Sequence, residues 1–380
     1  MGPGLYIHVP FCARRCPYCD FYAEVAGDAT KDRAVRAIVR EAEMRLPSWT
    51  GGAFDSVFLG GGTPSALGPR RLTALARGIR ERAPIAANAE WTLEANPDSA
   101  TAPFLETALE SGFNRLSLGI QSFGDAELAL LGRLHDAGRA KAAIADARRA
   151  GFRNLSIDLI YGLPGSDGGR GFRRSLETAV SLGPEHLSCY LLTLEPGVAM
   201  ERPVKEGALR LPSDAAQRRQ YDAACLVLEE AGYEHYEISN WARPGFRCRH
   251  NEGVWSGGDY LGLGPAAHGH LNGVRAANSA DLGTYLLSLE AGRLPPREEE
   301  AVDAKRRADE RLLLGLRLRD GLAWRDLARE FGHAWAGALK GKIGAFTEAG
   351  LVEDDGERLR LGQRGLFVSN RVIAALLEAA

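Results

Sequence analysis

The chain lacks several features that would assign it to particular classes of protein. Its 47 Lys and Arg nearly balance its 49 Asp and Glu, so there is no basic surplus of the kind that binds nucleic acid. No apolar run reaches the roughly 18 residues that span a bilayer. No charged segment with a cleavage site precedes the first apolar stretch. Six cysteines are too few for a disulfide framework in a chain of 380 residues. We therefore expect a soluble, cytoplasmic protein that does not bind nucleic acid.

Three of the six cysteines form a CxxxCxxC triplet near the N-terminus: Cys12, Cys16 and Cys19. Three thiolates can hold three irons of a [4Fe–4S] cluster and leave the fourth iron open for another ligand. The alternatives are a zinc knuckle and three unrelated thiols. Zinc would require a fourth Cys or His nearby, and the sequence just after Cys19 contains neither. The spacing therefore favours an iron–sulfur cluster with one open corner.

The first two thirds of the chain alternates short apolar runs with segments of helical periodicity. This alternation predicts an α/β fold with a parallel sheet whose strands are buried on both faces. The predicted strands cover residues 5–9, 56–59, 91–94, 115–120, 155–160 and 186–192.

Polar and glycine residues stand at the ends of these strands. Gly60-Gly61-Gly62-Thr63-Pro64 follows the second strand, Glu94 and Asn96 the third and Gln121 the fourth, while Asp158 lies inside the fifth. A carboxylate inside an apolar strand is costly unless it has a partner. Because the carboxyl ends of barrel strands meet at one mouth, we expect these residues to lie together. Six strands predict a partial (βα)6 barrel rather than a closed barrel of eight.

The organisation changes towards the C-terminus. We predict the partial barrel over residues 1–230, a glycine-rich connecting region over 231–300 and a mostly helical, winged-helix-like domain over 301–380. Since the chain has no basic surplus, we interpret the last domain as a packing module rather than a DNA-binding one.

Four motifs together resemble the radical SAM superfamily. They are the segment 6–12 (YIHVPFC), the cysteine triplet, the segment 60–64 and the segment 157–164 (IDLIYGLP). More narrowly, they are similar to the branch that holds the anaerobic coproporphyrinogen III dehydrogenases and the heme chaperones. The resemblance covers nearly the whole chain. It implies that S-adenosylmethionine chelates the open iron through its amino and carboxylate groups, and that an electron donor serves the cluster.

The resemblance also implies roles for individual residues. The cluster ligands would be Cys12, Cys16 and Cys19. The S-adenosylmethionine site would comprise Tyr6, Tyr18, Gly61, Gly62, Thr63, Glu94, Gln121, Arg133 and Asp158. From its place in the sequence alone, Arg133 would be interpreted as a surface residue.

Two positions distinguish the chaperones from the dehydrogenases. The dehydrogenases carry a further cysteine two residues after the triplet, where this chain has Phe21. Residues 250–255 (HNEGVW) resemble the HNxxYW motif of the chaperones, with Val254 where the family usually has Tyr. Neutral imidazole is a common axial ligand of heme iron, so His250 is the predicted heme ligand. The alternative is a histidine that is merely hydrogen-bonded within a glycine-rich loop.

The resemblance therefore implies a heme chaperone that passes heme to acceptor proteins, with respiratory membrane enzymes as the implied acceptors. One alternative is a radical enzyme that acts on coproporphyrinogen III or on an unrelated substrate. Another is a redox-sensing cluster protein without heme. The sequence favours the chaperone and leaves enzymatic activity open.

Overall fold

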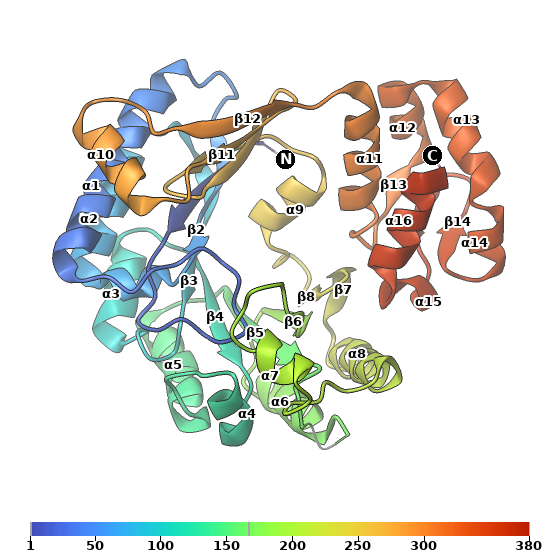
Figure 1. Cartoon of the computed structure of the whole chain (residues 1–380), viewed down its shortest axis with the longest axis horizontal. Coiled ribbons are helices and arrows are strands. Elements are labelled where there is room, and N and C mark those ends of the chain that lie inside the picture. Colours follow the sequence, from blue (N-terminus) through green and yellow to red (C-terminus); the bar gives the residue numbers. More distant parts are fainter. Residues whose placement is uncertain (1, 166–167, 380) are drawn as a thin grey trace.

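The computed structural model describes residues 2–165 and 168–379, which fold around a twelve-stranded sheet (Figure 1). Six neighbouring strands are parallel and follow each other in chain order. They are β1 (Gly4–Val9), β2 (Phe54–Gly61), β3 (Ile85–Ala95), β4 (Arg115–Gln121), β5 (Leu155–Tyr161) and β6 (His186–Leu191). These strands confirm the predicted α/β partial barrel. The one large difference is β3, which begins six residues before the predicted start at residue 91.

The helices of the barrel connect these strands. They are α1 (Asp28–Arg45), the short η1 (Leu46–Ser48), η2 (Pro64–Leu67), α2 (Pro69–Arg80), α3 (Ala102–Glu110), α4 (Asp125–Leu130), α5 (Ala137–Ala150) and α6 (Arg170–Ser181). Helix α5 shows how the sequence sets their ends. The Asp136 side chain accepts a hydrogen bond from the Arg139 N–H at its start, and Gly151 takes a left-handed conformation at its end.

The alternation of side chains along β1 separates the outer core from the barrel interior. Leu5, Ile7 and Val9 are fully buried and belong to the main apolar core of the molecule. Because successive side chains of a strand point to opposite faces, Tyr6 and His8 point to the interior. The functional residues described below lie on this interior face and at the mouth above it.

The segment after β6 adds strands to both edges of the barrel sheet. Strand β8 pairs antiparallel with β6, and β9 pairs parallel with β1. The elements of this segment are α7 (Glu201–Lys205), α8 (Asp214–Glu230), β7 (Glu234–Glu237), β8 (Asn240–Ala242), α9 (Arg249–Trp255), β9 (Tyr260–Leu263), β10 (His268–Leu271), β11 (Val274–Asn278), α10 (Leu282–Glu290) and β12 (Arg297–Ala301). The domain boundaries at residues 230 and 300 remain a prediction.

One local expectation for this segment was wrong. His250 does not lie in a glycine-rich loop but on the short helix α9, which lies between the barrel strands and the C-terminal helices (Figure 1). The physical reason is a buried carboxylate at the start of α9, described below, which binds backbone N–H groups that a loop would leave to water.

The C-terminal part is mostly helical and contains a small antiparallel sheet with the strand order β13-β15-β14. Its elements are α11 (Ala304–Gly315), β13 (Leu322–Ala323), α12 (Trp324–Phe331), α13 (His333–Lys342), α14 (Gly344–Glu348), β14 (Val352–Asp354), β15 (Arg358–Leu361), α15 (Gln363–Leu366) and α16 (Ser369–Ala379). This arrangement confirms the predicted winged-helix-like domain.

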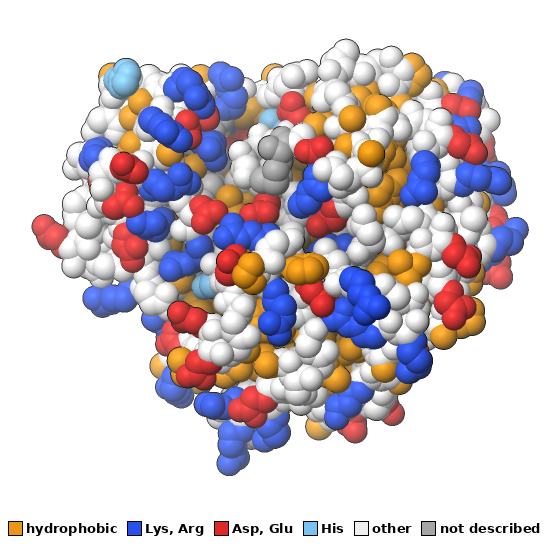
Figure 2. Space-filling view, turned by 180° about the vertical axis from the view of Figure 1, so that it is seen from behind, with side chains coloured by type: hydrophobic (Ala, Val, Ile, Leu, Met, Phe, Trp, Pro, Cys, Tyr) orange, Lys and Arg blue, Asp and Glu red, His pale blue; other side chains and the backbone are white. Residues whose placement is uncertain are grey.

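The surface carries mixed charge. Figure 2 shows Lys and Arg side chains interspersed with Asp and Glu over the face it presents, without a field of one sign. None of the helices in the described part of the chain combines the length and the apolar character needed to cross a lipid bilayer.

Candidate functional site

A cavity of about 360 Å³ brings together nearly all the residues predicted for the cluster and its cofactor. It lies at the carboxyl ends of the barrel strands, where barrel folds place their chemistry. The predicted residues that line it are Cys12, Cys16, Tyr18, Cys19, Gly61, Gly62, Thr63, Glu94, Gln121, Arg133 and Asp158. We call it the mouth cavity. Tyr6 and His250 do not line it, and the proposed role of Tyr6 toward the cofactor remains a prediction.

The cysteine loop contacts polar groups of the barrel. The Cys12 Sγ lies 3.3 Å from Thr63 Oγ1, and Arg133 donates a hydrogen bond to Cys16 Sγ over 3.6 Å. Burial raises the pKa of the Cys12 thiol, and the hydrogen bond with Thr63 opposes this rise. Thiolates are the form of cysteine that binds iron. The hydrogen bonds from Thr63 to Cys12 and from Arg133 to Cys16 would therefore favour iron binding.

Each of the three thiols can bind a different iron of a [4Fe–4S] cluster. Among the described residues, no three Cys, His or carboxylate side chains are grouped closely enough to hold one metal ion.

The glycine run at the end of β2 packs closely against β1 and the cysteine loop. Gly61 has a φ of 105°, and a Cβ there would lie 2.6 Å from the His8 ring. A Cβ on Gly62 would lie 2.7 Å from the carbonyl oxygen of Phe11. The Thr63 N–H donates to that same Phe11 carbonyl over 2.7 Å. A side chain at Gly62 would therefore push the cysteine loop away, and one at Gly61 would displace the His8 ring.

Two carboxyl groups face the mouth cavity from β3 and β5. Burial is the main cause that raises the pKa of Glu94 to about 8, and the charge of Asp158 adds to it. Asp158 accepts hydrogen bonds from Ser117 Oγ at 3.1 and 3.3 Å. The partner that this carboxyl group requires is thus a hydroxyl of the neighbouring strand β4. Burial still raises the pKa of Asp158, although Arg115 and several serine hydroxyls oppose the rise.

Gln121 offers a ligand a buried hydrogen-bond acceptor. It has a φ of 69°, which is rare for a residue other than glycine and is typical of functional sites. Its Oε1 is buried, and no hydrogen-bond partner for it exists among the described residues. Buried polar atoms in native proteins nearly always have partners, so a bound donor would satisfy this one. The amino group and hydroxyls of S-adenosylmethionine are donors of this kind, and the cavity therefore fits that cofactor.

Arg133 is not a surface residue, contrary to what its place in the sequence suggests. Its guanidinium donates to Asn96 Oδ1 over 2.6 Å and to the Gly119 carbonyl over 2.8 Å. Asn96 also lines the mouth cavity. Its position after the third strand predicted a place at the mouth, although it was not among the predicted cofactor-binding residues.

A second cavity, of about 550 Å³, lies against β1, β2 and α9. Its walls carry aromatic side chains and histidines, so we call it the aromatic pocket. The residues that line it include Tyr6, His8, Tyr22, Phe58, His250, Val254, Trp255, Tyr260, Ala266 and His268. Asp20 and Phe21 line both cavities and form a wall that the two share.

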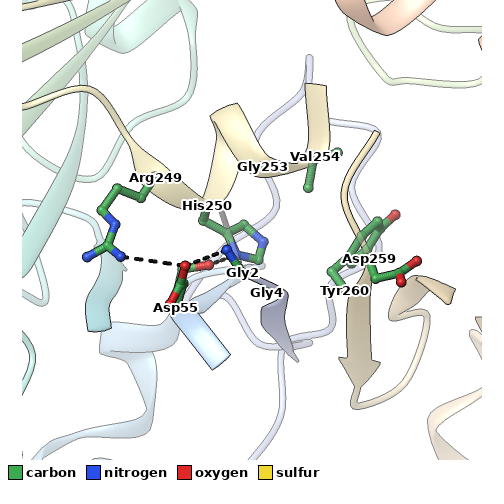
Figure 3. Close-up of a pocket in the computed structure, with 10 residues that line it drawn as sticks. Gly2, Gly4, Asp55, Arg249, His250, Gly253, Val254, Asp259 and Tyr260 are labelled. Atoms are coloured by element: carbon green, nitrogen blue, oxygen red, sulfur yellow. Dashed lines mark hydrogen bonds and ion pairs between the residues drawn. The ribbon is translucent and has the colours of Figure 1, made fainter. Parts of the chain in front are cut away.

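His250 is held firmly in the aromatic pocket. Its Nδ1 lies 2.9 Å from Ser56 Oγ, and its ring stacks on Phe58 with 5.1 Å between centroids. Burial lowers the pKa of His250 to about 4, so its imidazole is neutral at physiological pH. A Cβ on Gly4 would lie 2.9 Å from the ring. Figure 3 shows the histidine extending from α9 towards Gly4, with Val254 on the same helix and Tyr260 nearby.

The start of α9 is attached to the barrel by Glu90 of β3. The Glu90 carboxylate accepts hydrogen bonds from the backbone N–H groups of Arg249 and His250, over 3.3 and 3.4 Å. The Arg249 guanidinium also lies 3.9 Å from Asp55 (Figure 3). Neither Glu90 nor Ser56 was among the predicted site residues, because nothing in the linear sequence links them to residue 250.

Comparisons with known proteins identify the family of the chain. The model of the radical SAM superfamily matches residues 6–169, and the model of the HemN C-terminal domain matches residues 302–368. The heme chaperone HemW of Mycobacterium tuberculosis is 39% identical over 98% of this chain and 94% of its own length. The chain belongs to the HemN/HemW branch of the radical SAM superfamily.

Other members of this branch extend the comparison. The HemW of Bacillus subtilis is 32% identical over 98% of both chains. The structure of HemN from Escherichia coli, a coproporphyrinogen III oxidase and radical SAM enzyme, matches with a TM-score of 0.86 at 24% identity. It covers all of this chain and 90% of HemN, and it shows that the two share a fold. Membership of the superfamily implies a [4Fe–4S] cluster and S-adenosylmethionine as the cofactors of this branch.

Proposed function

We propose that this protein is a heme chaperone, which binds heme in the aromatic pocket and passes it to acceptor proteins. The observation that carries the proposal is His250: a neutral imidazole from an HNxxYW-like motif, placed in a large aromatic cavity. Heme is a flat, largely apolar ring around an iron that binds neutral imidazole. Aromatic walls would bury that ring, and pockets of roughly 300–1,000 Å³ are typical of ligands of this size.

Ser56 is the residue that would orient the His250 ring for iron binding. A hydrogen bond from the His250 Nδ1–H to Ser56 Oγ would leave the Nε2 lone pair for the metal. Ligands of metals usually donate their second ring N–H in this manner, which fixes both tautomer and ring orientation. Glu90 contributes by holding the backbone of His250 at the start of α9.

In the mouth cavity we propose that Cys12, Cys16 and Cys19 hold a [4Fe–4S] cluster. We propose that Gln121 and Asp158 accept hydrogen bonds from S-adenosylmethionine. When bound, the cluster would supply one-electron chemistry at the sulfonium of that cofactor, given an electron donor. The contacts of Thr63 and Arg133 with the cysteine sulfurs would stabilise the thiolates.

The experiment that tests the chaperone proposal is a heme titration of the anaerobically reconstituted protein, followed by the Soret band. We expect saturation near one heme per chain, and loss of specific binding in His250→Ala. The matched control is His333→Ala, since His333 is exposed on α13, outside the aromatic pocket. Absence of specific heme binding in the wild-type protein would overturn the proposal. Transfer is then tested by mixing the loaded protein with apo-forms of heme proteins, including respiratory membrane enzymes.

A second candidate is a radical enzyme that acts on coproporphyrinogen III. The shared wall of Asp20 and Phe21 favours it, because a tetrapyrrole in the aromatic pocket would lie next to the mouth cavity. Phe21 itself argues against it, since the dehydrogenases have a cysteine there. Efficient decarboxylation of coproporphyrinogen III under anaerobic, reducing conditions would favour this candidate over the chaperone.

A further inference from the structure

The three histidines that line the aromatic pocket differ in what their ring nitrogens contact. In His8 both nitrogens are engaged: Nδ1 lies 3.0 Å from the Tyr6 hydroxyl, and Nε2 lies 2.9 Å from the Tyr22 carbonyl oxygen. His8 therefore has no lone pair to offer a metal without breaking one of these contacts. His250 is buried and has one nitrogen engaged, by Ser56.

His268 is the third and differs from both. It begins β10, its side chain is exposed, and it lines the aromatic pocket from an element far from α9 in the sequence. Neither of its ring nitrogens has a hydrogen-bond partner within the described ranges 2–165 and 168–379. It is close enough to His8 for its charge to contribute to the lowered pKa of that residue, behind burial as the main cause.

The backbone beneath His268 is held in place. His268 pairs with Ala277 in the β10–β11 ladder, and a Cβ on Gly262 would lie 2.1 Å from the His268 carbonyl oxygen. The turn before it contains Ala266 at a φ of 58°, and this residue also lines the pocket. Backbone strain of this kind persists only where the surroundings fix it, and it is concentrated at ligand sites. The free imidazole thus stands on a rigid support at the rim of the pocket.

We infer that His268 supplies the second axial ligand of the heme iron, so that the bound iron is six-coordinate between His250 and His268. This inference rests on the proposed binding of heme in the aromatic pocket. His250 would be the buried, fixed ligand, and His268 the ligand on the solvent side. Transfer could then begin by ligand exchange: the bond from iron to the His268 nitrogen breaks as a bond to an acceptor side chain forms.

The test compares ferric heme binding by the full-length reconstituted protein and its His268→Ala and His268→Gln variants. We expect a low-spin, six-coordinate spectrum for the wild type. Both variants should become high-spin and five-coordinate, with heme affinity weakened roughly tenfold. Free imidazole should restore the low-spin spectrum in His268→Ala, which a merely structural role would not produce.

The chain offers a matched control two residues further along. His270 lies on the same strand, but its Nδ1 is 3.4 Å from Asp259 Oδ1, and it lines a different cavity. His270→Ala should therefore keep the wild-type spectrum and affinity. A low-spin spectrum in both His268 variants, or a five-coordinate wild type, would overturn the inference and leave the chaperone proposal standing. Failure of the wild type to bind heme at all would overturn the proposed function itself.

Discussion

The mouth cavity and the aromatic pocket share a wall but are built in different ways. Residues of the mouth cavity follow the ends of successive barrel strands, and short motifs identify most of them. Residues of the aromatic pocket come from β1, the segment 20–22, β2, α9, β9 and β10, which lie far apart in the sequence. The comparison teaches that a motif can indicate a cluster site directly, whereas a pocket assembled from distant elements becomes visible only in the fold.

Burial shifts the pKa of a side chain in opposite directions in the two cavities. Burial raises the pKa of Glu94 in the mouth cavity to about 8 and lowers the pKa of His250 in the aromatic pocket to about 4. In both cases the low-dielectric surroundings disfavour the charged form. An acid is thereby kept protonated and a base is kept neutral at physiological pH. Each cavity can receive its ligand without an isolated buried charge.

The largest expected effect is loss of the cluster from the mouth cavity without loss of heme binding in the aromatic pocket. Cys12→Ala should remove the cluster, because it deletes one of only three thiolate ligands, while heme affinity changes by no more than about twofold. Bound iron and sulfide measure the first result, and a heme titration measures the second. Cys225→Ala is the control, since this half-buried thiol lies on α8 away from both cavities. An intact brown chromophore in Cys12→Ala would contradict the cluster assignment.

Acid should lower the free energy of unfolding, because His250 in the aromatic pocket must be protonated. The pKa of His250 is about 4 in the folded state against 6.5 for the free side chain, so the unfolded chain binds more protons between these values. Stability due to this residue is full above pH 6.5 and is lost as pH falls towards 4, by up to about 3 kcal/mol. Denaturant unfolding of the wild type and His250→Gln at pH 7 and 4.5 measures it. Equal pH dependence in the two proteins would refute the prediction.

An intermediate effect is expected in the mouth cavity. Asp158→Asn should weaken the binding of S-adenosylmethionine about tenfold, because the amide keeps only one acceptor oxygen and turns an N–H group toward the donors of the cofactor. Equilibrium dialysis against the labelled cofactor measures this. Heme binding should remain unchanged, and Glu177→Gln, on the outer helix α6, should match the wild type in both assays. A loss of heme binding in Asp158→Asn would show that the two cavities are coupled.

The smallest expected effect concerns the departure from the HNxxYW motif. Val254 lines the aromatic pocket and is half-buried, so a tyrosine there could add ring contact and a hydroxyl near the heme. We expect Val254→Tyr to tighten heme binding about threefold, in line with one modest aromatic or hydrogen-bond contact. Val25→Tyr is the control, because Val25 is exposed and lies outside this pocket. Weaker binding in Val254→Tyr would show that the pocket has adapted to the smaller side chain.

The prediction from sequence succeeded where the signal is local. Buried parallel strands are short apolar runs, and five of the six barrel strands begin and end within two residues of their predicted bounds. Strand β3 was predicted too short because its first four residues, 85–88, are half-buried or exposed and therefore lack the pattern of a buried strand. The helix α9 was missed because a buried carboxylate of β3 stabilises its start, and no local pattern shows that contact.

The amino-acid sequence alone determined the family, the partial barrel and the cysteine loop, because strand periodicity and ligand spacing are properties of neighbouring residues. The tertiary structure decided the rest. It turned Arg133 inward onto Cys16 and brought His250 and His268 into one cavity. These outcomes depend on which strands pair and how the edges of the sheet are extended. Such long-range packing depends on the whole chain, and no local sequence pattern predicts it.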